Sequence, residues 1–159
     1  MQTQVGIIGG GPSGLCLARL LSLAGIKSVI LERQTREYVE ARIRAGILEQ
    51  GMADLMRRAK VSERMDREGL VHDGILLTFD DREERLDMAA LTGGKQVMVY
   101  GQTELTKDLY DAVLKDENVT VIFHAGDVRP QGYLVEGRKP VLEFFKDGKY
   151  RFEAEKLAY

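Results

Sequence analysis

Three glycines near the start of the chain have the spacing of a dinucleotide-binding loop. Gly9, Gly11 and Gly14 follow the apolar run Val5-Gly6-Ile7-Ile8 and precede a segment with helical periodicity. Gly9 permits a tight turn, Gly11 has no Cβ to keep a pyrophosphate from the backbone, and Gly14 lets a helix pack closely on a sheet. The first amide groups and the positive dipole end of that helix are expected to face the phosphates.

An acidic residue at the end of the second apolar run supports the same chemistry. The run Val29-Ile30-Leu31 is followed by Glu32, which lies 18 residues after Gly14. A carboxylate at this place accepts hydrogen bonds from ribose hydroxyls. Three spaced glycines alone are a weak signal, whereas a strand before them, a helix after them and this acid together predict a bound dinucleotide. The pattern does not by itself separate FAD from NAD(P).

The composition is that of a globular chain large enough for one domain with an ordinary core. Of the 159 residues, 44% are hydrophobic and 30% charged, and the formal net charge is −2. This charge argues against a general nucleic-acid binder. No apolar run approaches the roughly 20 residues of a membrane span, and no secretory signal is expected at the start. The single cysteine, Cys16, is expected to be a small core residue, and a cytoplasmic location fits these features.

The periodicity of apolar residues predicts an α/β fold that begins with a βαβ unit. Strands are expected at 4–8, 28–31, 74–79, 97–100 and 119–123. Helices are expected at 13–24, 35–41, 47–59 and 103–115, with a further turn at 61–65. An antiparallel three-stranded meander is expected at 126–135, 141–145 and 150–154. Asp147-Gly148 is its strongest hairpin signal, and residues 156–159 look like the beginning of another strand.

Two features favour FAD over NAD(P). The glycine-rich segment lies at the extreme N-terminus, as in many flavoproteins, and a long connection follows the second strand. Within this connection Arg42 and Arg44 stand two residues apart. In an extended segment both would point to one side and could bind phosphate or carboxylate oxygens. Two solvated surface arginines are an equally good interpretation.

Several longer segments resemble one family. They are Glu32-Arg-Gln-Thr35, Tyr38-Val39, Arg42-Ile-Arg-Ala-Gly46, Leu48-Glu-Gln-Gly51, Gly69-Leu-Val-His72 and Val99-Tyr-Gly-Gln-Thr-Glu104. The family is that of the single-component FAD-dependent aromatic hydroxylases that act on 4-hydroxybenzoate. The resemblance implies a Rossmann-like FAD domain interleaved with a sheet-based substrate domain. Residues 1–159 would form the FAD-binding portion of a larger flavin hydroxylase fold, with residues 70–100 belonging to the substrate region.

The resemblance also implies a reaction and its partners. NADPH reduces FAD while the phenol is bound, and O2 then forms a flavin C4a-hydroperoxide that hydroxylates 4-hydroxybenzoate, or a related phenolic acid, to 3,4-dihydroxybenzoate. Family members are commonly homodimers, and neither a membrane nor a nucleic acid is an expected partner. No metal site is expected.

The same resemblance assigns FAD contacts to eight residues: Gly9, Gly11, Ser13, Gly14, Glu32, Arg42, Arg44 and Gln102. The first four would hold the pyrophosphate, and Glu32 would bind the adenosine ribose. Arg42, Arg44 and Gln102 would also contact FAD, with Arg44 near the place where the flavin moves in and out.

A short helix after the second strand would select the nicotinamide cofactor. The resemblance places Arg33, Gln34 and Tyr38 there and implies a preference for NADPH, because a guanidinium pairs well with a 2′-phosphate. Arg36 and Glu37 depart from the family, which has a proline-containing segment at this point.

His72 matches a family histidine at the solvent end of a proton relay that deprotonates the phenol. Imidazole suits that role because its pKa lies near neutrality. Taken without the resemblance, His72 would be interpreted as an ordinary surface histidine beside Asp73.

Two other functions remain possible on the sequence. A simple NAD(P)-dependent Rossmann dehydrogenase would require a second βαβ half directly after Glu32. A non-catalytic FAD-binding module would need the same cofactor site without the chemistry. Family members are more than twice as long as this chain, and the residues that grip the substrate would lie beyond Tyr159. The 159-residue chain is therefore expected to be inactive alone.

Overall fold

The computed structural model describes residues 2–42, 45–133, 135–137 and 139–158. The chain divides into two compact units. The first unit comprises residues 1–43 and 106–159, and the second comprises residues 44–105.

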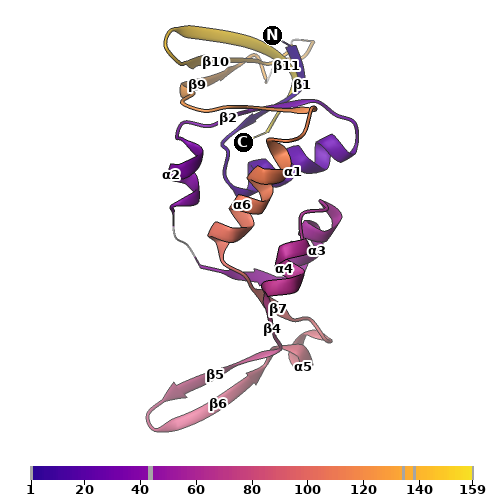
Figure 1. Ribbon diagram of the computed structural model, residues 1–159, viewed down its shortest axis with the longest axis vertical. Helices are drawn as coiled ribbons and strands as arrows, with labels where there is room; N and C mark the ends of the chain where they lie inside the picture. The colour runs from indigo at the N-terminus through magenta and orange to yellow at the C-terminus, as the bar shows by residue number, and fades with distance from the viewer. Residues whose placement is uncertain (1, 43–44, 134, 138, 159) are drawn as a thin grey trace. The chain divides into compact units, whose positions relative to one another are not determined.

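The first unit is built on a six-stranded mixed sheet with the order β8-β2-β1-β11-β10-β9 (Figure 1). Its strands are β1 (Gln2–Ile8), β2 (Ser28–Leu31), β8 (Val119–Ile122), β9 (Gly126–Gln131), β10 (Val141–Phe145) and β11 (Lys149–Ala158). The pairs β8–β2, β2–β1 and β1–β11 are parallel, whereas the pairs β11–β10 and β10–β9 are antiparallel. This confirms the predicted α/β class, with its βαβ start and its meander.

Three helices contribute to the first unit: α1 (Pro12–Leu23), α2 (Arg36–Glu40) and α6 (Gln102–Val113), which belongs to this unit from Thr106 onward. Helix α1 contacts β1, β2 and β8. Cys16 lies buried in this helix, as expected, and burial raises the pKa of its thiol.

The meander and the parallel strands share one hydrophobic core. The buried members of this cluster are Val29, Leu31, Ala125, Leu142, Phe144, Phe152 and Ala154. A Cβ on Gly6 of β1 would lie 2.7 Å from Cδ1 of Leu142, so the side chains of the meander pack closely against β1 at this point. Each buried leucine or phenylalanine contributes about 1.5–3 kcal/mol by burial, so this cluster stabilises the sheet that carries the glycine loop.

The last strand corrects one expectation. Residues 150–154 and 156–158 belong to a single strand, β11, rather than to two. Its first half pairs antiparallel with β10, and from Glu153 onward it pairs in parallel with β1, with Val5 opposite Lys156. The predicted hairpin turn at Asp147-Gly148 joins β10 to β11, and both residues have a positive φ.

The second unit contains short strands and helices. A three-stranded sheet consists of β3 (Ile47–Glu49), β7 (Val97–Val99) and β4 (Leu70–His72). Strands β5 (Gly74–Phe79) and β6 (Arg82–Asp87) form a separate hairpin. Its helices are α3 (Gln50–Arg58), α4 (Glu63–Glu68) and α5 (Met88–Thr92).

The prediction of a helix at 47–59 is wrong for its first three residues. Residues 47–49 form β3, which pairs antiparallel with β7, and the helix begins only at Gln50. Strands β4 and β6 and helix α5 were not predicted. A three-residue strand is defined by its partner rather than by its own pattern, which explains the differences at β3 and β4.

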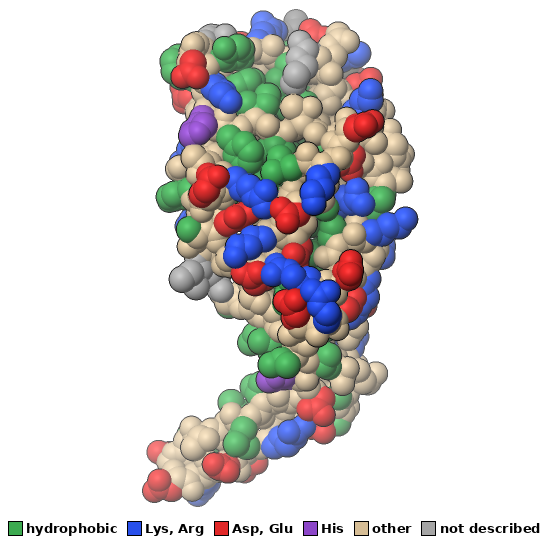
Figure 2. Space-filling model, viewed as in Figure 1, with side chains coloured by type: hydrophobic (Ala, Val, Ile, Leu, Met, Phe, Trp, Pro, Cys, Tyr) green, Lys and Arg blue, Asp and Glu red, His purple; other side chains and the backbone are tan. Residues whose placement is uncertain are grey.

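Large hydrophobic side chains are exposed along β4, β5 and β6. They are Leu70, Val71, Ile75, Leu76, Leu77, Phe79 and Leu86, and Figure 2 shows hydrophobic groups interspersed with charged ones over this region. Over the part of the chain that the structure describes, no helix combines the length and apolar character that crossing a membrane requires.

Candidate dinucleotide-binding site

The glycine loop lies at the carboxyl end of β1, where the chain turns into α1. Gly9 has a φ of +105°, a conformation that side-chain-bearing residues rarely adopt. Its N–H donates a 2.9 Å hydrogen bond to the carbonyl oxygen of Leu31 at the end of β2. The loop thus stands at the sheet edge where open α/β folds bind ligands.

The start of α1 presents backbone donors to an open surface. Gly11 is the N-cap, and no side chain caps this helix end by a hydrogen bond. A Cβ built on Gly11 would meet no atom within 4 Å, and Ser13 in the first turn is exposed. The first amide groups of a helix have no partner within the helix, so a phosphate can satisfy them here.

Gly14 is required by the closeness of α1 to the turn. A Cβ on this residue would lie 2.1 Å from the carbonyl oxygen of Gly9 and 3.2 Å from Cγ2 of Ile7. The helix can therefore begin directly over the end of β1 only because residue 14 has no side chain.

Glu32 lies beside the glycine loop and is nearly buried, with 9% of its surface exposed. Its Oε2 accepts a 2.7 Å hydrogen bond from the N–H of Gly10, and its Oε1 accepts a 2.8 Å bond from the N–H of Gln34. A carboxylate has about four acceptor positions, so two backbone donors leave it able to accept hydroxyl groups. The arrangement suits a ribose next to the loop.

Tyr110 of α6 contacts the glycine loop, and the sequence alone did not predict this role. Its ring is fully buried, and its hydroxyl donates a 2.7 Å hydrogen bond to the carbonyl oxygen of Gly10. A Cβ on Gly10 would lie 2.8 Å from this hydroxyl oxygen. Burial and the nearby carboxylate of Glu32 raise the pKa of Tyr110, so the phenol remains a donor. An aromatic residue beside Leu109 on the inward face of a predicted helix was the available signal.

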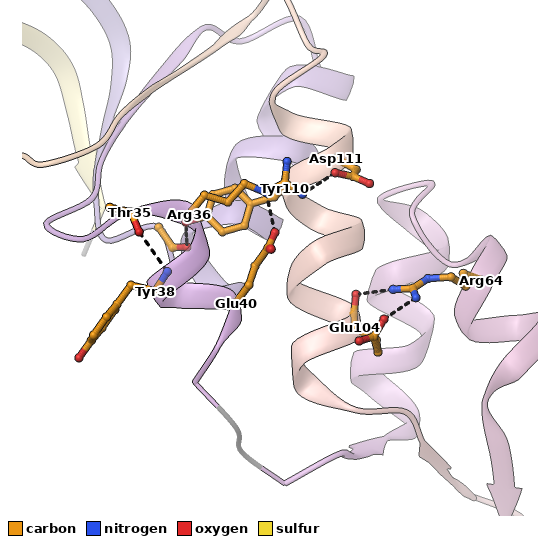
Figure 3. Close-up of polar contacts among 9 residues, drawn as sticks. Thr35, Arg36, Tyr38, Glu40, Arg64, Glu104, Tyr110 and Asp111 are labelled. Carbon is orange, nitrogen blue, oxygen red and sulfur yellow. Dashed lines mark hydrogen bonds and ion pairs between the residues drawn. The ribbon is translucent and has the colours of Figure 1, made fainter.

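Arg36 fixes the short helix α2 to α6 (Figure 3). Its Nε donates to Oε1 of Glu40 at 2.5 Å, and its Nη2 donates to Oδ1 of Asp111 at 2.6 Å. Its Cζ lies 5.6 Å from the centroid of the Tyr110 ring. The residue that departs from the family pattern therefore has a structural function in this chain.

The three residues expected to select the nicotinamide cofactor lie on and just before α2. Thr35 caps this helix by accepting a 3.1 Å hydrogen bond from the N–H of Tyr38. The side chain of Tyr38 is half exposed and points away from Tyr110 in Figure 3. Arg33 is exposed and Gln34 is partly buried, so the segment offers a charged and aromatic surface next to Glu32.

Four other predicted residues, Arg42, Arg44, Gln102 and His72, lie outside the glycine loop and α2. Arg42 is exposed, and Arg44 lies outside the described residues, so the predicted arginine pair stays a prediction. Gln102 begins α6, and the exposed His72 ends β4, opposite Val97; both belong to the second unit.

Comparison with known proteins identifies the family. The family model described as "FAD binding domain" matches residues 2–154. The chain belongs to this FAD-binding family. The match resolves the choice of dinucleotide that the glycine pattern left open, in favour of FAD. It also disfavours the simple NAD(P) dehydrogenase, since α2 and the second unit, rather than a second βαβ half, follow Glu32.

The relatives of this FAD-binding domain include aromatic monooxygenases. A p-hydroxybenzoate hydroxylase of Acinetobacter baylyi is 42% identical over 159 residues, which are 99% of this chain and 38% of that protein. The chain thus spans about two fifths of the length of this relative.

Solved structures share the fold. The p-nitrophenol 4-monooxygenase PnpA from Pseudomonas putida matches 98% of this chain and 40% of its own, with a TM-score of 0.81 and 18% identity. PqsL from Pseudomonas aeruginosa, described as a probable FAD-dependent monooxygenase, matches 99% and 42%, with a TM-score of 0.79 and 17% identity. The FAD-binding domain therefore has the flavin hydroxylase fold that the sequence predicted.

Proposed function

We propose that this chain provides the ADP-binding part of the FAD site in an aromatic hydroxylase. The enzyme would use NADPH and O2 to convert 4-hydroxybenzoate, or a related phenolic acid, to the 3,4-dihydroxy product. Bound FAD would supply hydride acceptance from NADPH and the activation of O2 for transfer of one oxygen atom. The family match supports the cofactor, and the identity to a p-hydroxybenzoate hydroxylase supports the reaction and substrate.

The observation that carries the proposal is the geometry around the start of α1. The open space at Gly11, the uncapped helix end and the close approach at Gly14 fit a pyrophosphate. The carboxylate of Glu32 stands beside them with acceptor capacity for the adenosine ribose. In this assignment Gly9, Gly11, Ser13 and Gly14 hold the pyrophosphate through backbone N–H groups and the helix dipole.

The segment after β2 would bind the nicotinamide cofactor. Arg33 has an exposed guanidinium and directly follows Glu32, whose carboxylate contacts the loop, and a 2′-phosphate is the group that distinguishes NADPH from NADH. Gln34 and the outward-facing Tyr38 would complete this surface. The ion pairs of Arg36 with Glu40 and Asp111 support α2 in place of the family's proline-containing segment.

Four further roles are proposed on the family resemblance. Arg42, Arg44 and Gln102 would contact FAD, and His72 would pass the phenol proton to solvent. The exposure of His72 suits exchange of the proton with water.

The resemblance also supports a proposal for the organisation of the complete enzyme. Residues 70–100 would belong to an interleaved substrate region, and the complete enzyme would be a homodimer.

A visible absorbance spectrum provides the first test. A purified yellow protein with flavin absorbance is expected, and a colourless protein that binds NAD(H) would refute the proposal. In a complete enzyme carrying this sequence, 4-hydroxybenzoate should stimulate NADPH oxidation. An FAD-containing enzyme without such stimulation would instead support a non-catalytic FAD-binding module.

A further inference from the structure

We propose that Tyr110 is a positioning residue of the FAD site, whose hydroxyl orients the Gly10–Gly11 peptide so that the Gly11 N–H faces the pyrophosphate. This inference rests on the proposed function, in which the glycine loop binds FAD. It adds a residue from α6, 100 positions along the chain from Gly10, to a site otherwise built from β1, α1 and β2.

Gly10 is held on both sides. Its N–H donates to Oε2 of Glu32 at 2.7 Å, and its carbonyl oxygen accepts from Tyr110 at 2.7 Å. In a trans peptide the C=O and the following N–H point in opposite directions. The hydrogen bond from Tyr110 therefore turns the N–H of Gly11 away from Tyr110. There is open space at Gly11, since a Cβ built there would meet no atom within 4 Å.

The loop needs such a restraint because of its composition. Three consecutive glycines, Gly9, Gly10 and Gly11, can adopt many backbone conformations, and each one loses more freedom on ordering than any other residue. A donor set that is fixed before the ligand arrives binds more tightly, since less ordering is required on binding.

Tyr110 is itself fixed in place. Its ring is fully buried and lies 5.9 Å from the ring of Phe123, centroid to centroid. The guanidinium of Arg36 lies over the ring and is anchored to Asp111, the next residue of α6 (Figure 3). A phenol with an ordinary pKa near 10 is protonated at neutral pH, and burial raises the pKa of Tyr110 further, so its hydroxyl remains a donor well into the alkaline range.

The test compares a phosphate-bearing ligand with one that has no phosphate. Titration calorimetry on the wild-type chain and on Tyr110→Phe measures the affinities for ADP and for adenosine. Loss of the hydroxyl leaves the Gly10 carbonyl without its partner and should weaken ADP binding roughly tenfold. Adenosine, which would reach Glu32 but not the loop, should bind equally well to both proteins. Tyr150→Phe is the matched control because Tyr150 is half exposed and lies on β11.

Each outcome decides the inference. Unchanged ADP affinity in Tyr110→Phe overturns it, and an equal loss for ADP and adenosine also overturns it, because that result indicates general distortion. If Tyr110→Phe does not fold, Arg36→Gln keeps the phenol but removes the cation over the ring and the ion pairs that anchor it to Glu40 and Asp111. That variant should weaken ADP binding about two- to fivefold without affecting adenosine, and no change in ADP binding would overturn the inference. A wild-type chain that binds neither ADP nor FAD would instead refute the proposed function.

Discussion

Gly14→Ala is the substitution that tests the geometry of the glycine loop most directly. The new Cβ would lie 2.1 Å from the carbonyl oxygen of Gly9, whereas real Cβ atoms essentially never approach another atom within 3.0 Å. The obstacle is a backbone atom in a turn and not the end of a flexible side chain. The helix start and the turn must therefore separate by at least 0.9 Å, the difference between these two distances.

The size of the effect follows from that displacement. Moving a donor by 0.9 Å from an ideal 2.9 Å contact gives a separation of about 3.8 Å, which is no longer a hydrogen bond. Each hydrogen bond to a charged oxygen contributes about 1.5–3 kcal/mol, so FAD should bind at least tenfold more weakly. Overpacking should also lower the free energy of unfolding by about 1–3 kcal/mol.

Two alanine variants are matched controls for the added methyl group. Gly51 is the second residue of α3, and a Cβ there would meet no atom within 4 Å. Gly51→Ala should leave FAD binding unchanged and should raise the unfolding free energy by about 0.5–1 kcal/mol. Gly11→Ala is also free of clashes within the chain, so it should keep its stability and lose FAD affinity because the methyl group occupies the phosphate space.

Fluorescence titration with FAD and thermal unfolding measure these two quantities. A Gly14→Ala protein that binds FAD with wild-type affinity would show that the close approach of α1 to Gly9 is not needed for the site. A Gly11→Ala protein that binds FAD normally would show that the pyrophosphate does not occupy the space next to Gly11.

Four further predictions follow from the site and the fold. The free energy of unfolding should fall above about pH 10, by up to about 1.4 kcal/mol per pH unit, because the unfolded phenol of Tyr110 ionises there while the folded phenol, with its raised pKa, does not. Tyr110→Phe should reduce this slope in denaturant titrations, and an unchanged slope would contradict the assignment. In a complete enzyme carrying this sequence, Arg33→Gln should reduce the preference for NADPH over NADH in flavin reduction, whereas the exposed control Arg129→Gln should not. Amide hydrogens of the exposed β5–β6 hairpin should exchange faster than those of β1 and β2, since a two-stranded hairpin is marginally stable by itself; hydrogen exchange with mass spectrometry would show equal protection if this were wrong. The purified 159-residue chain should not hydroxylate 4-hydroxybenzoate with NADPH, because it spans 38% of the length of its p-hydroxybenzoate hydroxylase relative, and product formation without any partner would refute this expectation.

The extent of successful prediction differed between the two units. In the first unit, the strands at β1, β2 and β8, helix α1 and the hairpin turn at Asp147-Gly148 were all predicted, because each has a strong local pattern. In the second unit, β3 was interpreted as helix, and β4 and β6 were missed. Strands β3 and β4 have three residues each, and pairing with β7, far along the chain, decides their conformation. Strand β6 consists mostly of charged residues and is a strand because it pairs with the adjacent β5.

The sequence by itself determined the cofactor loop and its acid. The spacing of Gly9, Gly11 and Gly14 and the place of Glu32 after the second strand are local properties of the chain, so they could be read without a structure. The resemblance to a family supplied FAD as the cofactor, and the family match supports it.

Only the tertiary structure decided what supports that loop. The contacts of Tyr110 with Gly10 and of Arg36 with Asp111 join residues 100 and 75 positions apart. The single strand β11 likewise pairs with β10 at one end and with β1 at the other. Such contacts depend on how α6 and the meander pack on the sheet, and no local pattern specifies that packing. The glycine loop was therefore evident in the sequence, but the residues that fix its orientation became evident only in the folded chain.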